Sequence, residues 1–289
     1  MAIIETCGLT KYYGKTRGIE NLTMEVESGE IFGYLGPNGA GKTTTIRTLL
    51  GFLKPTGGEA RVLGTDIEED IVEIKRQVGY VPGDLSLYGG LTGQEFLDFF
   101  SSLKGSDEDL LDVLLERFQV PLDREIQGYS RGMKQKVAII QAFMNDPELV
   151  IMDEPTAGLD PLMQETVYEF LREQKERGRT VFFSSHILSE VDKICDRVGI
   201  VREGKLVALE DIQSLKDKRG KRVRVKIEGD PRSFEGPKDT STEDEWIEFV
   251  VEDDINPWIR ELAKFNVLDL EVENFSLEDI FMRYYEEGG

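Results

Sequence analysis

Short apolar runs recur along the first two thirds of the chain, each followed by glycine-rich or polar residues. Residues 31–35, 149–152 and 180–184 are mostly apolar, which is typical of strands buried on both faces of a parallel sheet. Residues 19–26 instead alternate apolar with polar side chains, which predicts a half-exposed strand. Segments with helical periodicity lie between these runs. The pattern therefore predicts an α/β fold.

Two helices are predicted in the middle of the chain. Thr92 and Glu95 have the spacing of a capping box, so a helix should begin there. Residues 107–118 carry apolar side chains over a broad helical face. Both helices fall between the chemical motifs described below, and we expect them to form an inserted helical lobe over about residues 85–145.

The pattern changes after about residue 215. Residues 216–222 are charged and predict a linker, and the remainder predicts a ββαβα arrangement. We therefore expect a first domain over residues 1–215 and a small α+β accessory domain over residues 216–289. The predicted accessory elements are strands over 223–227, 246–251 and 267–272, helices over 256–265 and 276–286, and a polar loop over 230–243.

Composition narrows the function classes. The 289 residues are 39% apolar and 31% charged, as in a soluble globular protein, and no apolar run approaches the roughly 20 residues that span a bilayer. The net charge of −21 argues against a nucleic-acid partner, which selects for basic surfaces. Cys7 and Cys195 match no metal spacing and are expected to be reduced thiols of a cytosolic protein without a secretory signal.

A glycine-rich loop follows the first buried run. Residues 36–44 fit G-x-x-x-x-G-K-[ST], in which backbone N–H groups cradle phosphates. In this pattern Lys42 reaches the β- and γ-phosphates and Thr43 places its hydroxyl on Mg²⁺. A Gly-rich turn without a ligand is the alternative, but the strand–loop–helix context favours a nucleoside triphosphate site. The predicted nucleotide-binding residues are Gly36, Pro37, Asn38, Gly39, Ala40, Gly41, Lys42, Thr43 and Thr44.

Two acids end the apolar run at 149–152. Carboxylates at the end of a buried strand are costly unless they serve a cation or a reaction. Beside a phosphate loop, Asp153 is predicted to hold Mg²⁺ through water, and Glu154 to polarise the attacking water as a general base. A helix-capping acid pair is the competing interpretation, and the phosphate loop makes it the weaker one.

Three further features leave alternatives open. The single histidine, His186, follows the strand at 180–184 and could donate to a γ-phosphate at the ligand-binding edge of the sheet. Ser130 opens a helix, and on these residues alone an ordinary cap is favoured over an anion site. Tyr12 and Tyr13 are favoured as a strand-end pair, although an aromatic ring near a phosphate loop could also stack on a purine.

Together, these motifs resemble the nucleotide-binding subunit of ATP-binding cassette (ABC) transporters over about residues 3–210. The resemblance implies a P-loop NTPase cassette with a mixed sheet and an inserted helical lobe. Five motifs occur in family order: the P-loop, the signature at Ser130, Arg131 and Gly132, the Walker B strand ending in Asp153 and Glu154, a D-loop with Asp160, and the switch histidine His186.

The resemblance also implies roles. Tyr13 takes the adenine-stacking position, with Tyr12 as the fallback. Family subunits dimerise head to tail, so each ATP lies between one P-loop and the Ser130–Gly132 segment of the other subunit. ATP hydrolysis would then drive separate transmembrane permease subunits from a homodimer or a heterodimer. Such a subunit is cytoplasmic and peripheral on the inner face of the membrane.

Two departures from the family pattern stand out. The usual Leu-Ser-Gly-Gly-Gln signature reads Tyr-Ser-Arg-Gly-Met at residues 129–133, which resembles the subfamily serving ABC-2 type exporters of drugs, lipids or polysaccharides. A metal-contacting Gln is expected near position 83, where the chain has Gly83 followed by Asp84. Either Asp84 or water replaces that Gln, or coupling through this loop differs.

Two other function classes compete with transport. A soluble ABC ATPase that acts on DNA or ribosomes generally has two cassettes or long coiled-coil insertions, whereas this chain has one cassette and no heptad run. A regulatory switch that barely hydrolyses ATP is the other, but Asp153, Glu154 and His186 favour turnover. The transported substrate is not encoded in this chain.

Overall fold

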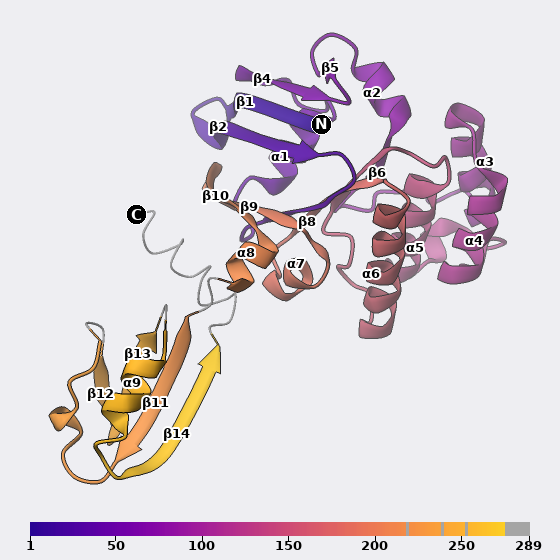
Figure 1. The fold of residues 1–289 in the computed structure, drawn as a ribbon. Helices are drawn as coiled ribbons and strands as arrows, with labels where there is room; N and C mark the ends of the chain where they lie inside the picture. Colours follow the sequence, from indigo (N-terminus) through magenta and orange to yellow (C-terminus); the bar gives the residue numbers. More distant parts are fainter. Residues whose placement is uncertain (218–219, 238–239, 252–253, 275–289) are drawn as a thin grey trace. The chain divides into compact units, whose positions relative to one another are not determined.

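A computed structural model describes residues 1–217, 220–237, 240–251 and 254–274 (Figure 1). Two compact units divide the chain, Met1–Asp211 and Ile212–Gly289. No helix within the described ranges combines the length and the apolar character that crossing a membrane requires.

A six-stranded mixed sheet forms the centre of the first unit (Figure 1). Its order is β10-β9-β3-β8-β7-β6, with neighbouring strands parallel except for the antiparallel pair of β9 and β10. The predicted mixed sheet is thus confirmed. Every residue of β3, β7 and β8 is buried, as their apolar runs predict. The strands are β3 Ile31–Leu35, β6 Val78–Val81, β7 Leu149–Asp153, β8 Thr180–Ser185, β9 Arg197–Arg202 and β10 Lys205–Asp211.

A second, antiparallel sheet of the same unit has the order β2-β1-β4-β5. Helix α1 (Lys42–Leu49) joins both sheets in one core, in which Val26, Ile46 and Phe32 are fully buried. Phe32 stacks on Phe182 with ring centroids 5.6 Å apart. This packing anchors the helix that follows the phosphate loop. The strands are β1 Ala2–Tyr13, β2 Thr16–Glu27, β4 Gly57–Val62 and β5 Thr65–Asp66.

The helices of the first unit begin largely where local caps predict. Thr92 and Glu95 form a reciprocal capping box at the start of α3, which confirms the prediction. Ser130 caps α5, and both α3 and α4 pack against that helix. The helices are α2 Ile71–Gln77, α3 Gly93–Lys104, α4 Glu108–Phe118, the 3₁₀ turn η1 Ile126–Gly128, α5 Arg131–Phe143, α6 Pro161–Glu176 and α7 Leu188–Ile194.

The second unit is a four-stranded antiparallel sheet with the order β12-β13-β11-β14. Its core contains Val223, Val225, Ile247 and Phe249 from the sheet, together with Leu262 of α9. The elements are α8 Ile212–Asp217, β11 Lys221–Ile227, the 3₁₀ turn η2 Pro231–Ser233, β12 Ser241–Glu243, β13 Trp246–Val251, α9 Asn256–Leu262 and β14 Val267–Asn274.

Two details of the predicted second unit are wrong. The charged segment 216–222 is not simply a linker, because α8 extends to Asp217 and β11 begins at Lys221. The pairing of Lys221 and Arg222 with β13 and β14 draws these charged residues into the sheet. The loop predicted over 230–243 contains η2 and an edge strand, β12. The helix predicted over 276–286 lies outside the described residues.

Candidate nucleotide-binding and catalytic site

The sheet order brings the predicted chemical motifs to one edge. Strands β3, β8 and β7 are adjacent and parallel, so their carboxyl ends lie together. β3 leads into the phosphate loop, β8 ends just before His186, and β7 ends at Asp153. Three motifs that are spread between residues 36 and 186 of the sequence therefore meet at one end of the sheet.

The phosphate loop closes tightly onto the start of α1. Gly41, the residue before the helix, has a φ of 105°, a backbone conformation that favours glycine. The Lys42 ammonium is buried and donates to the carbonyl oxygens of Gly36 at 2.7 Å and Pro37 at 3.2 Å. The lysine thus lies across its own loop at the N-terminal end of α1, where backbone dipoles favour an anion.

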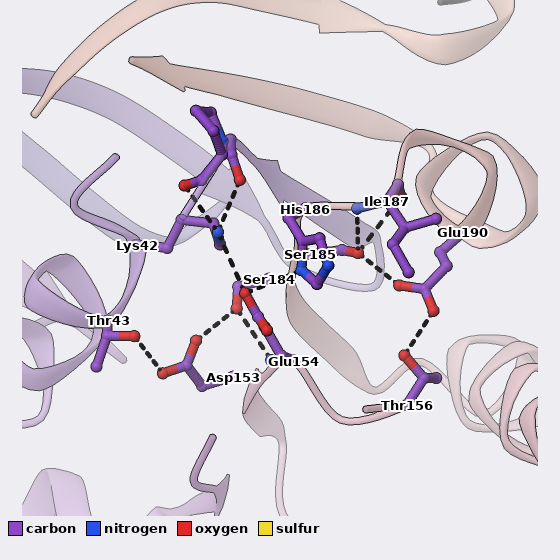
Figure 2. Close-up of polar contacts among 12 residues, drawn as sticks. Lys42, Thr43, Asp153, Glu154, Thr156, Ser184, Ser185, His186, Ile187 and Glu190 are labelled. Carbon is purple, nitrogen blue, oxygen red and sulfur yellow. Dashed lines mark hydrogen bonds and ion pairs between the residues drawn. The ribbon is translucent and has the colours of Figure 1, made fainter. Parts of the chain in front are cut away.

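Asp153 is held between two hydroxyl groups (Figure 2). Thr43 Oγ1 donates to its Oδ2 at 2.8 Å and Ser184 Oγ donates to its Oδ1 at 2.7 Å. The carboxylate is only 2% exposed. Burial, followed by the charge of Asp153, raises the pKa of the nearby Tyr80 to about 12, so this phenol stays neutral at pH 7.

The Thr43–Asp153 pair has the donor chemistry of a magnesium site. Hydroxyl and carboxylate oxygens are hard ligands, and Mg²⁺ in nucleotide sites takes one or two protein carboxylates together with phosphate oxygens and water. In the part of the chain that the structure describes, no group of three or more His, Cys, Asp and Glu side chains could hold a metal ion. These residues fit a metal that is shared with a nucleotide.

Glu154 has an unusual backbone conformation. Its φ is 50°, in the left-handed region that costs a non-glycine residue about 1–3 kcal/mol. The N–H of Glu154 donates to the carbonyl oxygen of Ser184 at 3.2 Å and to Ser184 Oγ at 3.1 Å, which holds this conformation. The backbone therefore turns sharply between Asp153 and Glu154, and the two acids have different partners.

The Glu154 carboxylate contacts two other predicted residues (Figure 2). Its Oε1 lies 3.2 Å from Lys42 Nζ and 3.2 Å from His186 Nδ1. The Glu154 and His186 side chains are 28% and 42% exposed, so both remain accessible to a ligand. A base, a cation and an imidazole thus converge beside the phosphate loop.

A cavity of about 300 Å³ opens beside these groups. Tyr13 lines it, with its hydroxyl 3.4 Å from Thr44 Oγ1, and is 48% exposed. Tyr12 is not among the lining residues, and its hydroxyl donates to Glu20 at 2.5 Å. The lining residues predicted from the sequence are Tyr13, Asn38, Gly39, Gly41, Lys42, Thr43, Thr44 and Glu154.

Sequence reasoning missed three lining residues, Thr16, Arg17 and Gly18. They open β2, which pairs with β1 across a two-residue turn so that Tyr13 faces Thr16. The short turn at Gly14 was the available signal, because it places the next strand beside the tyrosine. Arg17 adds a cation to the cavity, although it also contacts Glu20 at 3.4 Å and Glu203 at 3.3 Å.

The signature residues and the D-loop lie together but do not line this cavity. Ser130 caps α5 by accepting from Met133 N at 3.2 Å, and Asp160 caps α6 by accepting from Met163 N at 3.0 Å. The Arg131 side chain lies along Gly158, since a Cβ added there would be 2.8 Å from Arg131 Cδ. Within one chain, these exposed residues therefore belong to a separate surface.

The backbone at Gly83 approaches the predicted metal ligand. A Cβ added at Gly83 would lie 3.2 Å from Asp153 Oδ2, tighter than ordinary van der Waals contact. Glycine therefore allows this loop to pack against the carboxylate at the position where the family's Gln was expected. Gly83 and Asp84 also line a cavity of about 410 Å³ together with Arg131, which brings this loop next to the signature.

A phosphate loop, a buried aspartate against its threonine, and a glutamate beside a histidine on a mixed sheet define a P-loop ATPase. The family model described as ABC transporter matches residues 19–157. The chain is 35% identical to an uncharacterized ABC transporter ATP-binding protein of Synechocystis sp., over 99% of this chain and 86% of the relative. The chain therefore belongs to the family of ABC transporter ATP-binding proteins, as the sequence motifs predict, and is an ATPase.

Other relatives agree with this assignment. The chain is 39% identical to the bacitracin transport ATP-binding protein BcrA of Bacillus licheniformis, over 78% of this chain and 75% of the relative. It is 33% identical to the daunorubicin/doxorubicin resistance ATP-binding protein DrrA of Streptomyces peucetius, over 95% and 88%. The solved structure of an ATP-binding subunit of an ABC transporter matches with a TM-score of 0.69 and 32% identity, over 74% of this chain and 92% of that one. These comparisons support transport over the DNA- or ribosome-associated alternative.

Proposed function

We propose that this chain hydrolyses ATP at the edge formed by β3, β8 and β7 and thereby powers an ABC-2 type exporter. One observation carries the assignment of the site. Thr43 and Asp153 meet at 2.8 Å, while Lys42 and His186 both contact the Glu154 carboxylate at 3.2 Å. These contacts support Lys42 as a phosphate-binding cation, Thr43 and Asp153 as a metal-binding pair, and Glu154 as a base.

The phosphate loop and Tyr13 would hold the nucleotide. Backbone N–H groups of residues 36–44 and the Lys42 ammonium would bind the β- and γ-phosphates, and the Tyr13 ring would stack on adenine. Phosphate oxygens would compete with Glu154 for Lys42, because both are anionic partners of one ammonium group. Thr43 and Asp153 would hold Mg²⁺, which supplies neutralisation of the phosphate charge when bound.

Glu154 would act as the general base. Its carboxylate would take a proton from water as the water oxygen bonds to the γ-phosphorus and the bond to the ADP oxygen breaks. His186, in contact with Glu154, would donate to the γ-phosphate. The positive φ of Glu154 aims the carboxylate toward Lys42 and His186 and away from the partners of Asp153.

A second subunit would complete the site. Ser130, Arg131 and the D-loop residue Asp160 are exposed and lie outside the nucleotide cavity of their own chain, and the Arg131 side chain lies along Gly158 before Asp160. This arrangement supports a head-to-tail dimer, homomeric or heteromeric, in which one subunit's signature closes on the other's ATP. Closure, hydrolysis and reopening would pass motion to separate transmembrane permease subunits.

Export is supported by the Tyr-Ser-Arg-Gly-Met signature and by the similarity to BcrA and DrrA, whose names concern bacitracin transport and drug resistance. The chain would then lie on the inner face of the membrane. Its net charge of −21 speaks against a nucleic-acid partner. Purification from detergent-solubilised membranes tests this, since recovery of DNA or ribosomes in place of a multi-span membrane protein would overturn it.

Glu154→Gln tests the site. The amide keeps the shape of the carboxylate but cannot accept the proton of water, so kcat should fall by about 10²- to 10⁴-fold. ATP affinity should stay within a few-fold, since the phosphate loop is intact, and ATP should now accumulate a dimer. Steady-state ATPase assays, nucleotide titration and size-exclusion chromatography with light scattering measure these three quantities.

Normal turnover in Glu154→Gln would refute the base assignment. Lys42→Ala is the contrasting variant, because it removes a phosphate ligand and should weaken ATP binding itself. If Glu154→Gln and Lys42→Ala weakened ATP binding equally, this would contradict the separate roles of Glu154 in catalysis and Lys42 in phosphate binding. Persistence of a monomer in saturating ATP would contradict the shared site.

A further inference from the structure

A buried carboxylate lies behind the catalytic edge. Glu190, on α7, is only 6% exposed, yet it accepts hydrogen bonds from three hydroxyl groups. Thr156 Oγ1 donates to its Oε1 at 2.6 Å, Tyr168 OH donates to the same oxygen at 3.1 Å, and Ser185 Oγ donates to Oε2. A buried charge is costly unless it is hydrogen-bonded, and these donors offset that cost.

Two of the three donors, Thr156 and Ser185, belong to segments that carry the proposed catalytic residues (Figure 2). Thr156 stands two residues after Glu154, and Ser185 directly precedes His186. Tyr168 is on α6, the helix that Asp160 caps. All three donors are at most 3% exposed. Glu190 therefore connects, through buried contacts, the segments that bear the base, the histidine and the D-loop aspartate.

Two arms of hydrogen bonds meet at Glu190, one from Ser185 and one from Thr156. The arm to Ser185 shapes the turn at His186. Ser185 Oγ donates to Glu190 and also accepts from Ile187 N at 2.9 Å, so both ends of the His186 turn depend on this hydroxyl. His186 Nδ1 then lies 3.2 Å from Glu154. On the other arm, Thr156 sits in the turn that follows Glu154, where Ala157 N donates to the Glu154 carbonyl oxygen at 3.2 Å.

Every hydroxyl in the cluster can act as a donor. Burial, followed by the charge of Glu190, raises the pKa of Tyr168, so its phenol keeps its proton. An ionised carboxylate offers about four lone-pair sites, enough for all three donors. A neutral apolar residue would fill the same space without the desolvation cost, but it would leave three buried hydroxyls without this acceptor.

We propose that Glu190 is a positioning residue for ATP hydrolysis, holding the turn at His186 and the segment after Glu154 in a fixed relation. Its three hydroxyl donors neither line the nucleotide cavity nor belong to the phosphate loop. Glu190 therefore acts through Ser185 and Thr156. The competing interpretation is that the cluster stabilises the fold only. The two interpretations differ in whether a substitution of Glu190 changes the position and surroundings of His186.

Glu190→Gln separates the two arms. An amide has one acceptor oxygen, which the two donors Thr156 and Tyr168 should attract, and this turns the NH₂ group toward Ser185. Ser185 Oγ must then accept from residue 190 instead of donating to it, and its own proton turns to the carbonyl oxygen of Ile187, 3.3 Å away, so this hydrogen bond changes most. We expect kcat to fall about tenfold to a hundredfold, the effect of losing one hydrogen bond to a charged group, with ATP affinity unchanged within twofold.

The single histidine of the chain provides a direct signal. In protein labelled with ¹³C-histidine, the imidazole resonance reports His186 alone, and Glu190→Gln should shift or broaden it. Glu169→Gln, on the exposed side of α6, is the matched control and should change neither kcat nor the resonance. Ser185→Ala removes the same arm from the other side and should reproduce both effects, which covers the case that Glu190→Gln does not fold.

The outcomes are distinguishable from failure of the proposed catalytic roles, because each variant is compared with an active parent. Lower kcat together with a changed His186 resonance supports the proposal. Unchanged kcat, or a lower thermal midpoint with an unchanged resonance, would show that Glu190 serves stability only and would overturn it.

Discussion

The six-stranded sheet of the first unit and the four-stranded sheet of the second unit, hereafter the first and the second sheet, differ in how they accommodate polar residues. In the first unit every residue of β3, β7 and β8 is buried, whereas β11 and β13 of the second unit alternate between buried and half-buried positions. A polar group inside the first sheet must find a partner or bear a desolvation cost, while one on the second can remain solvated. A polar residue in the first sheet is therefore a stronger indication of a functional role than a polar residue on the second sheet.

The partners of these polar residues support that contrast. Asp153, Ser184 and Ser185 are at most 2% exposed, and each makes hydrogen bonds with the proposed catalytic machinery or with Glu190. On the second sheet, Arg224 and Glu271 form an ion pair at 2.7 Å with side chains 41% and 44% exposed. Such a pair contributes little to stability and indicates no ligand.

The largest expected effect comes from a matched pair of Asp→Asn changes. Asp153→Asn replaces an oxygen that accepts from Thr43 or Ser184 by an amide donor and removes the proposed metal charge. We expect Mg²⁺-dependent kcat to fall roughly a thousandfold, or about 4 kcal/mol. Asp269→Asn, on the exposed edge of β14, should leave kcat within twofold. ATPase assays across a Mg²⁺ titration measure both.

Restoration of full activity in Asp153→Asn at high Mg²⁺ would show that Asp153 contributes only weakly, and only to the affinity for Mg²⁺. A comparable loss in Asp269→Asn would show that charges on the second sheet affect catalysis, and the contrast between the units would no longer hold.

Features governed by local chemistry were predictable from the sequence. The capping box at Thr92 needs only residues within one helical turn, and the buried strands follow from continuous apolar runs. The placement of His186 at the ligand-binding edge, where β7 also ends, followed as well, because parallel strands end at one edge of a sheet. These predictions required no knowledge of which side chains face each other.

Features governed by tertiary pairing were not predictable. Ser184 bridges Asp153 and the Glu154 N–H only because β7 and β8 are neighbours in a particular register. Glu190 reads as an ordinary polar residue of a short helix until Thr156 and Ser185 are placed around it. Arg17 enters the cavity through the register of β1 and β2, and β12 exists only because β13 offers an edge.

A second pair of variants tests whether the units are independent. Ile151 of β7 and Ile247 of β13 are both fully buried, so Ile→Ala at either should cost about 3 kcal/mol through lost burial and a residual cavity. Ile151→Ala should lower the unfolding transition of the first unit and the ATPase activity at higher temperature. Ile247→Ala should lower only the second unit's transition. Calorimetry of the full chain with a parallel ATPase assay resolves the two.

A single transition shifted equally by both variants would mean that the units unfold together. Loss of ATPase activity in Ile247→Ala at temperatures where the first unit stays folded would give the second unit a direct part in catalysis.

The smallest expected effect is that of Glu271→Gln, the same substitution proposed for the buried Glu190. Glu271 accepts from Arg224 at 2.7 Å in a half-exposed pair, so neutralising it should change the free energy of unfolding by less than about 1 kcal/mol. Salt should remove even that difference, because about 1 M salt reduces the screening length to roughly 3 Å. Urea denaturation at low and high salt measures the change. A larger or salt-independent loss would mean that the second sheet, like the first, depends on its polar residues.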